Sequence, residues 1–257
     1  MSDQWRSSAW PALPPPRGVP LTVLPEHACS YLPPRMSQTR GFVCDRLPAE
    51  LYHELMDAGF RRSGRFFYQP ICAGCRACQP IRVPVQKFRP SKSQRRAWRR
   101  NQDLVITVGA AEATDEKFDL YARYVREWHS RGEDADRKSF VEFLYDSPVD
   151  TIEFLYRSPA DNRLLGVGLC DVSSRSLSSV YFYFDPAEAR RGIGTFSALV
   201  ELDFARRHDI PHYYLGYFIA GCGTMSYKAN FRPHEILHPD GVWRATGEIG
   251  KSPDHTG

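Results

Sequence analysis

The sequence has no apolar run near the roughly 20 residues that a membrane-spanning helix needs, so we expect no contact with the membrane interior. Its first residues, MSDQWRSSAWPALPPPRGVPL, show no basic region followed by an apolar one, and so do not resemble a secretory signal. We find no internal repeat, and no low-complexity tract beyond the Pro-rich start. These absences favour a cytoplasmic protein. Its 42% hydrophobic and 25% charged residues are typical of a folded globular chain.

Acidic residues are absent from residues 61–102, although Lys and Arg occur there twelve times. This segment therefore carries a charge of +12, whereas the remaining 22 basic and 30 acidic residues give −8. The net charge of +4 for all 257 residues conceals this division. A strongly basic segment on an acidic body indicates a polyanionic partner.

Cysteine is sparse, with seven residues, but three of them form the cluster Cys72-x-x-Cys75-x-x-Cys78. Two-residue spacings bring thiolates together around a zinc ion or an iron–sulfur cluster. Such a site needs a fourth ligand, for which Cys29 is a better candidate than His27. The odd count and the missing secretory signal favour metal binding over disulfides. The alternative is a set of reduced thiols without a metal.

The densest basic run is SKSQRRAWRR at residues 91–100, which we expect to form a short helix. Arginines pair well with phosphates, and Trp98 is suited either to stacking on a base or to packing on the protein body. We predict a surface for nucleic acid, with tRNA as the natural partner, built from Arg95, Arg96, Arg99 and Arg100. The alternative is a solvated helix face.

Three regions are predicted: an irregular Pro-rich segment of residues 1–25, a basic cysteine-containing domain of residues 26–103, and a larger domain of residues 104–257. In the smaller domain we expect a helix over 47–58 and short strands over 65–69 and 81–85. The larger domain has the order strand, helix, helix, three strands, loop, helix, strand, over residues 104–108, 114–130, 139–145, 152–156, 164–171, 179–184, 190–194, 195–207 and 213–219.

The loop of residues 190–194 contains two glycines and leads into a helix. Such a turn is an anion site, because free backbone N–H groups and the helix dipole face the ligand. The order of elements resembles the GNAT acyltransferase fold, in which this loop has the pattern Arg/Gln-x-x-Gly-x-Gly and holds a cofactor pyrophosphate; here Ala189 takes the first position. We therefore predict an α+β protein, with a GNAT-like mixed sheet flanked by helices and a smaller cysteine-containing N-terminal α/β domain.

Several segments, taken in order, resemble the aminoacyl-tRNA–protein transferases of the N-degron pathway. The resemblance is to the bacterial branch, the aspartate/glutamate leucyltransferases, which are relatives of the eukaryotic arginyltransferases, and it covers nearly the whole chain. The order of these segments along the chain is more specific to the family than any single motif is. The segments are Cys29–Pro33, the cysteine cluster with Gln79–Arg82, the SKSQRR run, Tyr183–Pro186, Gly192–Thr195, Tyr214–Tyr217 and Met225–Lys228.

This resemblance implies transfer of leucine from Leu-tRNA to the α-amine of proteins that begin with Asp or Glu, which marks them for degradation. It also implies that acetyl-CoA is not used, in agreement with Ala189. The alternatives are an arginyl-tRNA–protein transferase with the same acceptors and a GNAT N-acetyltransferase that uses acetyl-CoA. Some eukaryotic relatives are reported to hold an iron–sulfur cluster, but Leu32 stands here in place of a second N-terminal cysteine.

The implied reaction is aminolysis of an activated ester, which needs no cofactor. It needs a deprotonated amine, alignment with the carbonyl carbon and donors for the oxyanion. We expect Tyr183, Asp185 and Tyr217 near the chemistry, with Asp185 orienting the amine or a ribose hydroxyl, and Lys228 binding the acidic side chain or a phosphate. For Asp185, a strand-ending turn is the structural alternative. The loop residues expected to contact the tRNA end are Arg190, Arg191, Gly192, Gly194 and Thr195.

Overall fold

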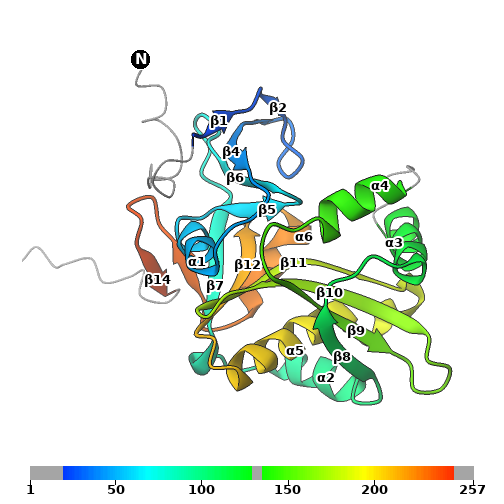
Figure 1. Ribbon diagram of the computed structural model, residues 1–257. Coiled ribbons are helices and arrows are strands. Elements are labelled where there is room, and N and C mark those ends of the chain that lie inside the picture. Colours follow the sequence, from blue (N-terminus) through cyan, green and yellow to red (C-terminus); the bar gives the residue numbers. More distant parts are fainter. Residues whose placement is uncertain (1–19, 129–134, 246–257) are drawn as a thin grey trace, which may run out of the picture.

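A computed structural model of the chain describes residues 20–128 and 135–245 (Figure 1). Its centre is an eight-stranded sheet in which every neighbouring pair is antiparallel except β11 and β12, which are parallel. The sheet order is β14 (Trp243–Ala245), β13 (Glu235–Leu237), β7 (Gln79–Pro84), β12 (His212–Phe218), β11 (Ser176–Phe184), β10 (Leu164–Val172), β9 (Thr151–Arg157) and β8 (Val105–Ala110).

Helices cover both faces of this sheet (Figure 1). On one face lie α3 (Asp115–Trp128), α4 (Arg137–Phe140) and η3 (Val141–Tyr145); on the other lie α2 (Lys92–Arg100) and α5 (Ile193–Arg207). The main core fills the space between these layers, with Phe154, Leu169 and Phe196 among its fully buried residues. The α+β class, with a large mixed sheet flanked by helices, is therefore confirmed.

A smaller region packs against one end of the large sheet. It contains a four-stranded sheet and the helix α1 (Ala49–Asp57), which buries Tyr52, Leu55 and Met56. The core of this region includes Tyr214 of β12, so the two regions share buried surface. The small sheet has the order β1 (Thr22–Val23), β4 (Thr39–Val43), β6 (Phe66–Pro70) and β5 (Arg61–Ser63), with a separate pair formed by β2 (His27–Ala28) and β3 (Met36–Ser37).

The chain enters the large sheet earlier than the predicted domain boundary at residue 103. Strand β7 lies between β12 and β13, and α2 packs on α5. The remaining short elements are η2 (Val85–Lys87), η4 (Pro186–Arg191), α6 (Gly223–Ser226) and η5 (Tyr227–Asn230). The division at residue 103 stays a prediction, and most of the predicted segment 1–25 lies outside the described residues.

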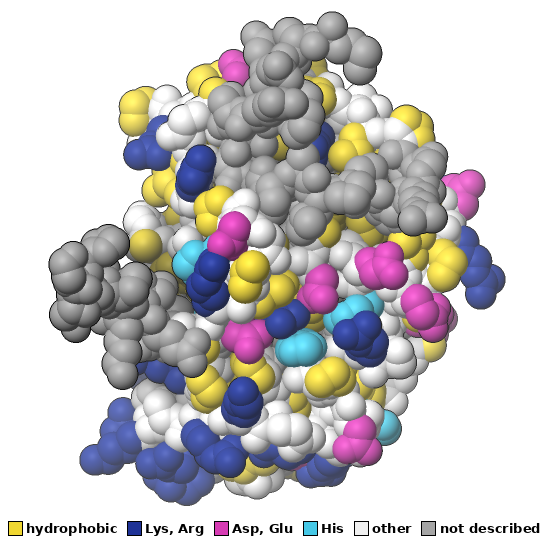
Figure 2. All heavy atoms as spheres, turned by 90° about the vertical axis from the view of Figure 1, so that its left-hand side faces the viewer, with side chains coloured by type: hydrophobic (Ala, Val, Ile, Leu, Met, Phe, Trp, Pro, Cys, Tyr) yellow, Lys and Arg dark blue, Asp and Glu magenta, His cyan; other side chains and the backbone are white. Residues whose placement is uncertain are grey.

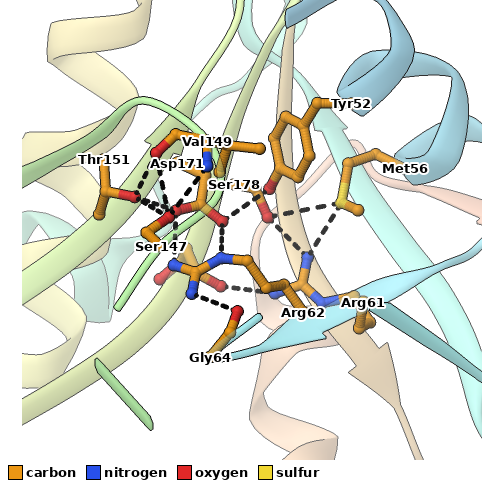
Figure 3. A network of polar contacts seen from close by, with 11 residues as sticks. Tyr52, Met56, Arg61, Arg62, Gly64, Ser147, Val149, Thr151, Asp171 and Ser178 are labelled. Atoms are coloured by element: carbon orange, nitrogen blue, oxygen red, sulfur yellow. Dashed lines mark hydrogen bonds and ion pairs between the residues drawn. The ribbon is translucent and has the colours of Figure 1, made fainter. Parts of the chain in front are cut away.

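A buried ion pair joins the two regions (Figure 3). Arg62 of β5 donates from Nε to Asp171 Oδ2 at 2.8 Å and from Nη2 to Oδ1 at 2.7 Å. Tyr52 and Thr151 donate to the same carboxylate. Because both charged side chains are at most 1% exposed, these bonds replace the water that each charge loses on folding.

No helix in the described parts of the chain has both the length and the apolar character needed to cross a bilayer.

Candidate functional site

Strands β11 and β12 separate soon after they meet. Within the described chain they pair only from Ser176 to Ser178 of β11, against His212 to Tyr214 of β12. Beyond Ser178, β11 keeps its partner β10 on one edge; residues 179–182 are half-buried, and Tyr183 and Phe184 are buried again. We call this place the β11–β12 divergence. On the side of β12, the backbone of β11 beyond Ser178 has no strand partner among the described residues.

Arg61 reaches from β5 into the β11–β12 divergence. Its Nη1 donates to Ser178 Oγ and its Nη2 to the Ser179 carbonyl oxygen, both at 2.7 Å; Figure 3 shows the first of these contacts. Gly216 of β12 has a φ of +85°, and a Cβ built there would lie 3.3 Å from Arg61 Nε. A glycine at this position thus accommodates both the left-handed backbone and the guanidinium.

Lys228 lies beside the same stretch of β12. Its Nζ donates to the Tyr217 carbonyl oxygen at 3.0 Å and lies 3.5 Å from Met225 Sδ, and the residue is only 8% exposed. Burial, followed by the charge of Arg61, lowers the pKa of Lys228 to about 7. Near neutral pH, the lysine is therefore divided between its charged and neutral forms.

The two tyrosines predicted near the chemistry are buried. Tyr217 donates its hydroxyl to the Gly59 carbonyl oxygen at 2.9 Å, and the Tyr183 hydroxyl lies 2.8 Å from that of Tyr145. Burial raises the pKa of both phenols, so both stay protonated. Of the two residues, Tyr217 is the one that contacts Lys228, through its backbone.

Asp185 lies in the turn that follows β11. Its Oδ1 accepts from the Ala187 backbone N–H at 3.1 Å, as the N-cap of η4. Its Oδ2 accepts from Arg163 Nη1 at 2.6 Å, and Arg123 Nη1 lies 3.6 Å away. These contacts are those of a strand-ending turn, and any role for Asp185 in catalysis stays a prediction.

The predicted tRNA-binding helix forms as α2, closed at its start by a capping box between Ser91 and Gln94. Trp98 is half-buried, with its ring 5.4 Å from that of Phe196, so it packs on the protein body. The arginines project into solvent: Arg95, Arg96, Arg99 and Arg100 are all exposed.

The structure brings α2 next to the loop that precedes α5. Arg100 Nη1 donates to the Arg190 carbonyl oxygen at 2.5 Å, and Asn101 Nδ2 to the Arg191 carbonyl oxygen at 3.0 Å. Gly192, with a φ of +67°, is the N-cap of α5, and Gly194 is exposed in the first turn of this helix, followed by the half-buried Thr195. The two segments predicted to bind tRNA therefore form one surface. Figure 2 shows Lys and Arg side chains along the lower edge, at the level of α2 and α5 in Figure 1.

Part of the +12 segment is neutralised inside the molecule. Arg62 pairs with Asp171, Arg82 with Asp57 and Glu235. Arg65 pairs with Asp45 and Asp146. Most of the exposed basic residues of the segment that have no ion pair among the described residues lie on α2; the others are Arg76, Lys87 and Arg89.

Comparison with known proteins identifies the family. Residues 27–96 and 116–238 match the families described as "Arginine-tRNA-protein transferase, N terminus" and "C terminus". The aspartate/glutamate leucyltransferase of Hahella chejuensis is 39% identical over 84% of this chain and 93% of its own length; that of Stenotrophomonas maltophilia is 42% identical over 82% and 86%. The chain belongs to the aspartate/glutamate leucyltransferase family.

Solved structures similar to this leucyltransferase-family chain are distant. L-PGS from Bacillus licheniformis is 12% identical, with a TM-score of 0.44 over 69% of this chain and 52% of its own. A tandem GNAT protein from the clavulanic acid biosynthesis pathway is 11% identical, with a TM-score of 0.35 over 69% and 55%.

The cysteines of this leucyltransferase-family member do not fit the predicted zinc or iron–sulfur site. No group of three or more His, Cys, Asp or Glu residues within 20–128 and 135–245 is arranged to hold a metal ion. Arg35 Nη1 donates to Cys75 Sγ at 3.2 Å, and the Gln38 N–H donates to Cys72 Sγ at 3.4 Å. Burial, together with the nearby thiols of Cys72, Cys29 and Cys75, raises the pKa of Cys78 to about 12, so this thiol stays protonated in the metal-free protein.

Reasoning from the sequence missed Arg61 and Gly216. The charge pattern groups Arg61 with the basic surface, although this residue follows a helix and stands between Phe60 and the apolar pair Phe66–Phe67. Of the three arginines between Phe60 and Phe66, Arg61 and Arg62 are buried but Arg65 is exposed, so aromatic neighbours in the sequence do not single out Arg61. The glycine is recognised only when its positive φ is known.

Proposed function

We propose that the protein transfers leucine from Leu-tRNA to the α-amine of proteins that begin with Asp or Glu, in the cytoplasm, and so marks them for degradation. Membership of the leucyltransferase family supports the reaction. The observation that carries the proposal is the surface formed by α2 and the loop before α5, which presents exposed arginines beside a helix N-terminus. Such a surface suits the phosphates of a tRNA acceptor end.

The chemistry is a nucleophilic substitution at the ester carbonyl carbon. The α-amine nitrogen forms a bond to this carbon, the bond from carbon to the tRNA ribose oxygen breaks, and that oxygen leaves with a proton. No cofactor is needed, because the ester is already activated. An α-amine has a pKa near 8, so a substantial fraction is neutral at physiological pH and a strong base is not required. Alignment is the main contribution expected from the enzyme.

Among the predicted site residues, Lys228 is placed best for this role. It lies at the β11–β12 divergence, where the free edge of β11 offers backbone donors and acceptors. We propose that its cationic form binds the acidic side chain of the acceptor. Asp185, with its arginine partners, and the buried Tyr183 would shape the site around β11 instead of touching the amine.

Neutralising the exposed arginines of α2 should weaken tRNA binding. The variant replaces Arg95, Arg96, Arg99 and Arg100 by Gln. We expect the slope of log Kd against log salt concentration to fall by about 3 in this variant, because each lost phosphate contact lowers this slope by roughly 0.7 to 0.9. Fluorescence anisotropy with labelled Leu-tRNA, at several salt concentrations, measures this slope.

A matched control removes four exposed arginines from other parts of the chain, by replacing Arg46, Arg126, Arg137 and Arg175 by Gln. This variant has the same net charge as the α2 variant, so it should keep a slope close to that of the unaltered protein. Equal slopes for the two variants would show that α2 is a solvated helix face.

The transferred residue is tested with a peptide that begins with Asp. The protein is incubated separately with tRNA charged with leucine, tRNA charged with arginine, and acetyl-CoA, and the products are analysed by mass spectrometry. We expect addition of one leucine to the N-terminus and no product in the other two reactions. Addition of arginine or of an acetyl group would replace the proposed activity by one of the two alternatives.

A further inference from the structure

Arg61 is a buried cation without a carboxylate partner. It is 9% exposed, and no Asp or Glu among the described residues forms an ion pair with it. The adjacent Arg62, in contrast, has Asp171. Because consecutive strand residues point in different directions, Arg62 reaches β10 while Arg61 reaches β11 (Figure 3). A buried charge without a counter-charge is costly, and this cost is offset when an anionic ligand binds.

Lys228 is a second cation at the same place. The guanidinium of Arg61 lies beside Gly216, and Lys228 donates to the carbonyl oxygen of the next residue, Tyr217. Lys228 also has no ion pair with an Asp or Glu in the parts of the chain that the structure covers; its Nζ contacts a carbonyl oxygen and a thioether sulfur. Two cations therefore flank residues 216–217 of β12, and neither is paired with an acidic side chain of the described chain.

Hydrogen bonds fix the orientation of the Arg61 guanidinium but do not use all of its N–H donors. Arginine has five N–H donors. One bond goes to Ser178 Oγ and one to the Ser179 carbonyl oxygen, and these fix the plane of the fork. A Cβ at Gly216 would lie only 3.3 Å from Nε, so the glycine allows the guanidinium to approach the backbone of β12 closely. Nη1 also lies 3.8 Å from Met56 Sδ, so Nε and one N–H of Nη2 are the donors left without an acceptor among the described residues.

We propose that Arg61, together with Lys228, binds the side-chain carboxylate of the acceptor's first residue and thereby sets the preference for Asp and Glu. This inference rests on the proposed function. A carboxylate accepts two parallel bonds from a guanidinium, and a short acidic side chain fits a buried position. A tRNA backbone instead needs an open surface such as that of α2. Two nearby cations also favour the neutral form of the α-amine, which is the nucleophile.

The test compares peptides that begin with Asp and with Asn, which have nearly the same shape but differ in charge. We measure kcat/KM for both peptides with Leu-tRNA, in the unaltered protein and in Arg61→Gln. The ratio of the two values should fall by about 10- to 100-fold in the variant, since a hydrogen bond to a charged group contributes about 1.5 to 3 kcal/mol. A general loss of activity through altered structure leaves this ratio unchanged.

Two further variants complete the test. Arg175→Gln removes an exposed arginine from the turn between β10 and β11, and should keep the Asp-to-Asn ratio of kcat/KM of the unaltered protein. Arg61→Lys keeps the charge but not the fork, so we expect a ratio between those of the unaltered protein and Arg61→Gln. If circular dichroism shows that Arg61→Gln does not fold, the Asp-to-Asn ratio of kcat/KM is measured in Arg61→Lys instead. A reduced ratio in this variant supports the proposal, and an unchanged ratio overturns it.

The other outcomes separate this inference from the proposed function. An unchanged Asp-to-Asn ratio in folded Arg61→Gln, with a raised KM for Leu-tRNA, would assign Arg61 to a tRNA phosphate and overturn the inference. An unaltered protein that transfers leucine equally to both peptides would also overturn it, while the transfer itself would stand. Absence of transfer to any peptide would refute the proposed function instead.

Discussion

Replacement of Asp171 by Asn will lower the free energy of unfolding by about 3 to 5 kcal/mol. The change keeps the shape of the side chain but leaves the guanidinium of Arg62 buried without its counter-charge, and removing one partner of a buried pair carries this cost. Because Arg62 lies on β5 and Asp171 on β10, the pair joins the small region to the large sheet. Urea unfolding followed by circular dichroism measures the difference.

The control is the same substitution in an exposed ion pair. Asp45, which pairs with Arg65, has a side chain that is 88% exposed, so Asp45→Asn should change stability by less than about 1 kcal/mol. If Asp171→Asn cost no more than Asp45→Asn, the buried pair would not stabilise the contact between the two regions.

Replacement of Lys228 by Met is expected to stabilise the protein at pH 6 by a few kcal/mol and to reduce leucine transfer strongly. Burial lowers the pKa of Lys228 from 10.5 to about 7, and a difference of one in pKa between the folded and unfolded states corresponds to about 1.4 kcal/mol. Below pH 7 the folded protein must hold a charged, buried lysine, whereas the methionine fills similar space without a charge. The substitution also removes the cation proposed to bind the acidic side chain.

The pH dependence of this effect follows from proton binding. Between about pH 7 and 10.5, the unfolded chain keeps the proton of Lys228 that the folded protein has lost, so the stability of the unaltered protein rises with pH in this range. The advantage of Lys228→Met over the unaltered protein should therefore be larger at pH 6 than at pH 9. Chemical unfolding at both pH values, with the exposed Lys138→Met as control, measures it. An equal advantage at both values would contradict a lowered pKa.

Local sequence patterns were sufficient for the longer elements. The predicted helices over 47–58, 91–100 and 195–207 correspond to α1, α2 and α5, and the strands over 152–156, 164–171 and 179–184 to β9, β10 and β11. Helix α2 begins with a capping box, α1 follows Pro48 and ends before Gly59, and α5 follows Gly192, while the strands are apolar runs bounded by turns. These signals are local, so they can be read without knowledge of the partner. The end of the helix predicted over 114–130 lies outside the described residues.

The short strands were missed, because each is defined by its partner. Strands β1 to β3 have two residues each, and β13 and β14 have three. Segments of this length have no periodicity, and they count as strands only through hydrogen bonds to segments far away in the chain. The position of β7 between β12 and β13 is likewise a product of non-local pairing.

The sequence by itself determined the family, through motifs in a fixed order, and the basic character of α2, whose arginines have no acidic neighbour to pair with along the chain. Only the tertiary structure decided which cations face solvent. Arg61, Arg62 and Arg95 count equally in a charge sum, yet the first lies at the β11–β12 divergence, the second pairs with a carboxylate 109 residues away, and the third is exposed. The physical reason is that burial and pairing depend on which strands meet, and for β5, β10 and β11 this depends on packing between distant parts of the chain.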